Sequence, residues 1–166
     1  TITADNARLV SNLHANLGGL YRMNGHPDLA REHMEKSISL LDQFNLLHIN
    51  DSIPQIANYA MFLTEQQEPE RGISELQKLS GIIKEYHSDD CLDYAKVQET
   101  LGTIYLMTAN LPQAKTHFKR AFKIYEKIWA DEPEMIEAKY QEIQELYPQV
   151  GFFLGQQISS FLTKQA

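Results

Sequence analysis

The sequence predicts an all-α fold built from antiparallel helix hairpins, and three observations support this prediction. The first is an internal repeat of 42 residues, in which residues of one size class recur three times. The second is the helical spacing of apolar residues within each copy, and the third is the position of prolines at the expected helix starts. The repeated columns are Leu17, Tyr59 and Leu101; Gly18, Ala60 and Gly102; Tyr21, Leu63 and Tyr105; Ala30, Gly72 and Ala114; Met34, Leu76 and Phe118; and Leu40, Ile82 and Ile124.

The third copy shows the hairpin pattern most clearly. Leu101 and Tyr105 are four residues apart and therefore share one face of a first helix. Ala114, Phe118 and Ala121 share one face of a second helix in the same way. Small residues stand where two backbones must approach, and large residues fill the remaining space. The pattern therefore predicts two helices that close on each other.

The expected helix boundaries rest on prolines and capping residues. A first helix is expected over about residues 4–23 and ends before Gly25, which can adopt the left-handed conformation of a helix cap. A second helix then begins at Pro27, because proline lacks the N–H that the first turn of a helix leaves unpaired. The third helix is expected to begin at Asp51 or Ser52, both of which are good capping residues.

The remaining helices follow the same logic. The fourth is expected from Pro69 to about residue 86, and the fifth follows a cap at residues 87–90. The sixth follows a turn at residues 110–112, and the seventh follows Pro133. Gly72 lies inside the fourth helix, where glycine costs about 1 kcal/mol relative to alanine. The second copy is therefore expected to be the weakest.

The whole chain, residues 1–166, is expected to form a single array with repeats at about residues 4–45, 51–87 and 89–130. Residues 132–164 read as a degraded fourth unit or cap, because a further step of 42 residues meets Ile143 and Tyr147 but also Gln144 and Gln156. The last helix is too apolar for a solvated cap. We expect it to support self-association or to contact further repeats through Phe152, Phe153, Ile158 and Phe161.

The order Leu-Gly, Tyr, Ala and Phe in the third copy resembles the signature of the tetratricopeptide repeat. The period of 42 residues exceeds the usual 34, and this length together with Asn16-Leu17 is similar to the kinesin light chain subclass. The resemblance implies a right-handed α-α superhelix whose first helices line a concave groove. Some members of the family bind the terminal carboxylate of their ligand with five side chains of characteristic type. This chain does not match them, because Ala15, Gly19 and Thr100 stand at three of the five positions and only Asn58 and Lys96 agree.

Composition and charge exclude several classes of function. The chain has 15 basic and 22 acidic residues, a formal net charge of −7, and no basic stripe is visible, so nucleic acid is not an expected partner. No apolar run is long enough to span a membrane, and no signal peptide is recognisable. The single cysteine, Cys91, cannot form an internal disulfide, which favours a reducing, cytoplasmic location.

The sequence contains no pattern typical of a catalytic or metal site. No two of the six histidines have the spacing that places a pair of ligands on one helix face, and His33 and His117 occupy the same repeat column. The cluster His87, Asp89, Asp90 and Cys91 could bind a metal on paper, but Ser88 and Asp89 favour a helix cap instead. We therefore expect no enzyme activity, no metal and no cofactor. An enzyme with an unrecognised site remains an alternative, which a copurifying metal or cofactor would support.

The predicted binding surface is the face of each first helix that lies opposite the hairpin seam. Asparagine side chains can donate and accept hydrogen bonds at once, which suits the main chain of an extended peptide. Methionine adapts to varied side chains. The alternative is that these residues are merely tolerated on an exposed face. The candidate groove residues are Asn12, Asn16, Met23, Asn58, Met61, Glu65, Lys96, Thr100, Thr103 and Met107.

The sequence thus predicts a non-catalytic scaffold or adaptor that binds a peptide or protein segment in a concave groove. The alternative function is a regulatory or oligomerisation segment of a larger protein, of the kind found in peptide-responsive bacterial regulators. A DNA-binding or catalytic domain elsewhere in that larger protein would favour the alternative.

Overall fold

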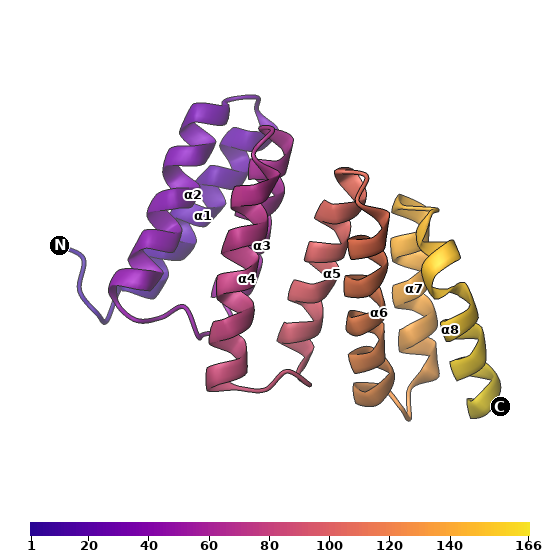
Figure 1. The fold of residues 1–166 in the computed structure, drawn as a ribbon. Coiled ribbons are helices and arrows are strands. Elements are labelled where there is room, and N and C mark those ends of the chain that lie inside the picture. The colour runs from indigo at the N-terminus through magenta and orange to yellow at the C-terminus, as the bar shows by residue number, and fades with distance from the viewer. The chain divides into compact units, whose positions relative to one another are not determined.

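The computed structural model describes residues 1–166 and contains eight α-helices and no strand, which confirms the expected all-α fold (Figure 1). Consecutive helices are joined by short turns and run antiparallel in pairs. No helix is both long and apolar enough to cross a membrane. The helices are α1 (Ala7–Met23), α2 (Pro27–Gln43), α3 (Ser52–Glu65), α4 (Pro69–Tyr86), α5 (Leu92–Met107), α6 (Leu111–Ile128), α7 (Pro133–Leu146) and α8 (Val150–Gln165).

The chain divides into two compact units, residues 1–86 and residues 87–166, which we call the first unit and the second unit. In the first unit α1 pairs with α2, α3 pairs with α4, and α2 packs on α3. In the second unit α5 pairs with α6, and α8 packs on both α6 and α7. The organisation as one array with the repeat bounds given above stays a prediction.

Prolines begin the helices where the sequence places them. Pro27, Pro69 and Pro133 are the first residues of α2, α4 and α7. Gly25 has a φ of +74° in the turn before α2, as expected of a left-handed cap. The same conformation recurs one and two repeats later at Gln67 and Ala109, with φ of 65° and 59°. All three hairpin turns therefore share one backbone path, although only the first has glycine.

Two expected caps form differently. At the start of α5 the capping residue is Cys91, whose Sγ accepts a hydrogen bond from Tyr94 N at 3.4 Å, whereas Ser88 Oγ accepts from Asp90 N within the preceding turn. At the start of α3 the Asp51 carboxylate makes no capping bond, because it pairs with Arg8 of α1. The start of α3 at Ser52 with Asp51 at the N-cap position is as expected, and only the side-chain capping bond is missing; α5 is capped by Cys91, one residue after the expected cap.

Two columns of small residues bring the helices of each hairpin together. Ala30, Ala60 and Ala114 are fully buried, and Gly18, Gly72 and Gly102 are buried beside them. A Cβ atom added to Gly72 would lie 2.6 Å from the backbone oxygen of Ala60, closer than real Cβ contacts. Gly72 is therefore not a weak point in α4, because the close approach of α3 and α4 requires glycine there.

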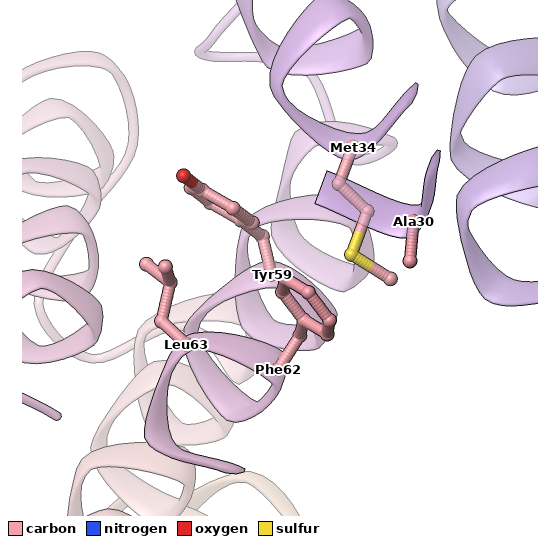
Figure 2. Packing of buried hydrophobic residues seen from close by; sticks show 5 residues of the cluster. All are labelled: Ala30, Met34, Tyr59, Phe62 and Leu63. Carbon is pink, nitrogen blue, oxygen red and sulfur yellow. The ribbon is translucent and has the colours of Figure 1, made fainter. Parts of the chain in front are cut away.

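Larger apolar residues then fill the space between hairpins. In the first unit Ala30 and Met34 of α2 form one buried cluster with Tyr59, Phe62 and Leu63 of α3, and Tyr21 and Ile38 pack against it (Figure 2). The hydroxyl end of the Tyr59 side chain points away from Met34 in this view. In the first unit, α3 is therefore covered by α2, the second helix of the preceding hairpin.

Leu17 and the residues of α8 depart from the burial expected of them. Leu17 belongs to a seam column, yet 39% of it is exposed, because no further helix lies against α1 as α2 lies against α3. In α8, Leu154 and Ile158 are buried, and α8 packs on α6 and α7. Ile158 is therefore unavailable for the self-association expected of it, whereas Phe152 is 90% exposed.

Candidate functional site

A groove of about 490 Å³ lies in the first unit, where α1, α2 and the start of α3 meet. Its walls combine apolar residues such as Met23 and Met34 with several polar side chains. Four carboxamides line it: Asn12 and Asn16 from α1, and Gln55 and Asn58 from α3. We call it the carboxamide groove after these four residues.

Gln55 forms the floor of the carboxamide groove and is held by a buried polar network. Only 8% of Gln55 is exposed. Its Oε1 accepts a hydrogen bond from Ser37 Oγ at 2.5 Å, and Ser11 Oγ lies 2.9 Å from the same oxygen. Ser11 and Ser37 are themselves almost fully buried. The network fixes the orientation of the amide, because its oxygen faces the two hydroxyl groups and its nitrogen faces the groove.

The network continues along the groove to a charged pair at its edge. Gln55 Nε2 donates to Asn12 Oδ1 at 2.5 Å, and Asn12 Nδ2 donates to Asp51 Oδ2 at 3.0 Å. Arg8 binds Asp51 with two hydrogen bonds, of 2.6 and 3.0 Å. The hydrogen bonds from Arg8 and Asn12 lower the pKa of the Asp51 carboxyl group. Asp51 is therefore an anion at neutral pH, and both its carboxylate and the Asn12 amide are held in place.

Asn16 and Asn58 differ from the other two carboxamides because their side chains make no hydrogen bond to the rest of the chain. Both side chains are exposed, both line the groove, and neither makes a hydrogen bond within the protein. Each offers an N–H donor pair and a carbonyl acceptor to a ligand. The groove thus has a fixed polar floor and two free amides at its surface.

The structure brings together four of the ten candidate residues, namely Asn12, Asn16, Met23 and Asn58. Met61 and Glu65 come from the same helix as Asn58 but do not line the groove. The carboxylate of Glu65 pairs with Arg22, whose Nε donates to Glu65 Oε2 at 2.9 Å. Glu65 therefore acts by holding Arg22, which does line the groove.

The other four candidates, Lys96, Thr100, Thr103 and Met107, lie on α5 in the second unit. They line neither of the two cavities described in that unit. Thr100 Oγ1 donates to Lys96 O at 3.0 Å, and Thr103 Oγ1 donates to Glu99 O at 3.1 Å. Because these hydroxyl hydrogens are used by the helix itself, the two threonines retain only acceptor capacity for a ligand.

Sequence reasoning missed Ser11, Ser37 and Gln55, although the repeat contains a signal for them. Moving by 42 residues from each meets apolar residues that are buried, such as Ile53 for Ser11 and Val97 for Gln55. A buried polar residue in a column that is otherwise apolar needs a partner, since an unpaired buried polar group is costly. The three exceptions fall in the first unit and are partners of one another.

Several titratable side chains of the chain pair with neighbouring side chains. His33 stacks on Tyr21 and His117 stacks on Tyr105, each with 5.3 Å between ring centroids. The two histidines of this repeat column therefore make the same kind of contact. Burial raises the pKa of Tyr125, whose hydroxyl donates to Glu99 Oε2 at 2.6 Å. No group of three or more histidine, cysteine, aspartate and glutamate side chains is placed to hold a metal ion.

Comparisons with known proteins agree with this architecture. Residues 52–127 match the tetratricopeptide repeat family, whose repeats are generally protein-interaction modules and typically not catalytic. The crystal structure of BtubC (BKLC) from P. vanneervenii has the same fold, with a TM-score of 0.72 and 18% sequence identity over 99% of this chain. The chain spans 63% of the length of that protein. No curated protein matches the sequence significantly. In the family match over residues 52–127 and in its fold, the chain is thus similar to tetratricopeptide repeat proteins.

Proposed function

We propose that the carboxamide groove binds an extended segment of another protein, and that the chain is a non-catalytic scaffold or adaptor. The observation that carries this proposal is the pair of free amides, Asn16 and Asn58, at the surface of a groove of about 490 Å³. The volume lies within the range of about 300 to 1,000 Å³ that ligand sites have. Such a groove is also open enough to accept a continuous chain.

The chemistry of the groove fits a peptide main chain. Asn16 and Asn58 can each donate to a peptide carbonyl and accept from a peptide N–H, so they recognise the backbone rather than one side chain. Met23 is 84% exposed and, with Met34, offers flexible apolar surface to the side chains of the segment. The Asp51 carboxylate at the edge accepts hydrogen bonds from donors of the ligand. Thr100 occupies the repeat column of Asn16 and Asn58, and we propose α5 as a continuation of this surface on that equivalence alone.

A peptide selected from a random display library on the wild-type chain provides the ligand for a direct test. Asn16→Leu and Asn58→Leu each remove one free amide without disturbing a hydrogen bond of the folded protein. Since a hydrogen bond contributes about 0.5 to 1.5 kcal/mol, each change is expected to weaken peptide binding by about 2- to 10-fold. Isothermal titration calorimetry measures the affinities.

Asn50→Leu is the matched control, because Asn50 is exposed and lies outside the groove. It is expected to leave the affinity unchanged. Thermal melting of all three variants should match the wild type, since neither amide has a partner inside the protein. If the selected peptides bind the Asn16→Leu and Asn58→Leu variants as tightly as the wild type, the carboxamide groove is not the binding site.

A further inference from the structure

A second groove lies in the second unit between α6 and α8, and its volume is about 760 Å³. We call it the basic groove, because α6 lines it with Lys115, Lys119, Arg120 and Lys123, opposite Phe152 and Phe153 of α8. None of these residues lines the carboxamide groove. An inference from the basic groove is therefore independent of the function proposed above.

The three lysines of the basic groove make no ion pair or hydrogen bond, unlike two other lysines of the second unit, although the charge of Lys123 acts on the nearby Glu126 carboxyl group. Lys127 pairs with Asp90, and Lys139 pairs with Glu99 at 3.1 Å. Lys115, Lys119 and Lys123 are exposed and make neither an ion pair nor a hydrogen bond. Because they recur at every fourth residue, they form one stripe along α6.

The charge of the basic groove is opposite to that of the whole chain. Glu126 supplies the one carboxylate of its lining, and Glu126 Oε1 accepts a hydrogen bond from Gln157 Nε2 at 3.0 Å. Four cations against one carboxylate leave the groove positive in a chain whose formal net charge is −7. A local excess of positive charge attracts a ligand of negative charge. The ligand is therefore an anion.

Phe152 indicates that the ligand also carries an apolar group. It is 90% exposed, more than any other large apolar side chain of the protein. Its neighbour Phe153 is half-buried and lines the same groove. An apolar group of the ligand that covers Phe152 removes this surface from water.

We propose that the basic groove binds an acidic, extended segment of another protein. Lysines four residues apart on a helix are separated by about 6 Å along the helix axis. Carboxylates on alternate residues of an extended chain are separated by about 6.6 to 6.8 Å, so successive acidic residues meet successive lysines. An apolar residue of the same segment lies against Phe152.

A single-stranded nucleic acid is the other ligand that combines regular negative charge with groups that stack on aromatic rings. A protein segment is favoured because the Glu126 carboxylate lies among the lysines, where a continuous phosphate backbone would pass but a protein segment can place an uncharged residue. The test distinguishes the two ligands.

Fluorescence anisotropy with the full chain at low ionic strength provides the test. The probe is a labelled peptide with glutamate at alternate positions and one leucine at its centre. The comparison ligands are the same peptide with glutamine in place of glutamate and a labelled oligothymidylate of similar length. We expect the glutamate peptide to bind, the glutamine peptide to bind at least about tenfold more weakly, and added salt to reduce the difference.

Variants of the basic groove locate the binding. Lys119→Glu is expected to lower the affinity for the glutamate peptide at least about tenfold, and Phe152→Ser is expected to lower it about threefold. Lys115→Glu and Lys123→Glu repeat the charge test at neighbouring positions. Lys36→Glu on α2 is the matched control, because it makes the same charge change at an exposed lysine outside the groove, and its effect should stay below about twofold.

Three results would overturn the proposal: no binding of the glutamate peptide, equal losses for Lys36→Glu and Lys119→Glu, or tighter binding of the oligothymidylate than of the glutamate peptide. Asn16→Leu and Asn58→Leu should leave binding of the glutamate peptide unchanged, which separates this site from the carboxamide groove.

Discussion

The first and third repeats place the same columns of residues in different surroundings. Leu17 is 39% exposed, whereas Leu101, two repeats later in the same column, is 1% exposed. Three residues further along each helix, Leu20 is 56% exposed and Ile104 is fully buried. Helices α1 and α5 therefore have similar apolar patterns but different environments.

The second repeat shows what covers the same columns in α3. Tyr59 and Phe62, which stand between these residues in the same two columns, are 3% and 1% exposed. Both lie in the cluster with Ala30 and Met34 of α2. A repeat column thus specifies which residue faces a neighbouring helix, but the neighbour itself decides whether that residue is buried. The leucines of α1 follow the same apolar spacing, but no neighbouring helix covers them as α2 covers α3.

The largest expected effect tests this comparison at Leu17 and Leu101. Leu101→Ala is expected to lower the free energy of unfolding by about 2 to 5 kcal/mol, because it leaves a cavity at a fully buried position. Leu17→Ala should cost less than about 1 kcal/mol, since that side chain is already partly solvated. Urea denaturation followed by circular dichroism measures both. Equal losses would show that α1 is covered in solution in a way that this structure lacks.

The second effect concerns the small-residue column Ala30, Gly72 and Ala114. Gly72→Ala would make the second repeat identical to the other two in this column, and helix propensity alone predicts a gain of about 1 kcal/mol. We expect a loss of about 1 to 3 kcal/mol instead, because the added Cβ would lie 2.6 Å from the backbone oxygen of Ala60.

Gly81→Ala on the same helix is the control for Gly72→Ala. A Cβ at Gly81 meets nothing within 4 Å, so this substitution should stabilise the protein by about 0.5 to 1 kcal/mol. Thermal unfolding of the two variants should therefore shift in opposite directions. A gain for both would mean that α3 and α4 can separate slightly without cost.

The fold could be predicted well from sequence because its determinants are local. Prolines and turn residues mark the helix ends, and the small columns mark the hairpin seams. From the sequence, the left-handed turn conformation could be predicted only at Gly25, because glycine favours it. Gln67 and Ala109 adopt the same left-handed conformation, although neither residue type favours it. The geometry of the hairpin therefore imposes this conformation on them.

The candidate site was predicted less completely because it depends on contacts between helices. Helical spacing placed Asn12, Asn16, Met23 and Asn58 on one face, and the structure joins them in one groove. Spacing could not show that Gln55 is buried beneath them. The overall acidic charge also concealed the lysine stripe of α6, since a net value contains no information about where the charges lie.

The smallest expected effect compares His33 and His117, which share a column and a stacking tyrosine but differ in their hydrogen-bond partners. His33 Nδ1 lies 2.8 Å from His14 Nδ1, and His117 Nδ1 lies 2.8 Å from Gln98 Oε1. Burial, with a smaller contribution from nearby Arg120, lowers the pKa of His117 to about 4. Between about pH 6.5 and pH 4 the unfolded chain therefore binds a proton at His117 that the folded chain does not.

Stability contributed by neutral His117 is thus fully present above about pH 6.5 and is lost as the pH falls toward about 4. Because the ring is only partly buried, we expect this to amount to about 1 to 2 kcal/mol. In His117→Gln the decrease in melting temperature between neutral pH and about pH 4.5 should be smaller than in the wild type. His26→Gln, at an exposed position, controls for the loss of a histidine. If His117→Gln and His26→Gln have the same pH dependence, the ring of His117 is protonated in the folded state as readily as in the unfolded chain, and its burial does not hold it neutral.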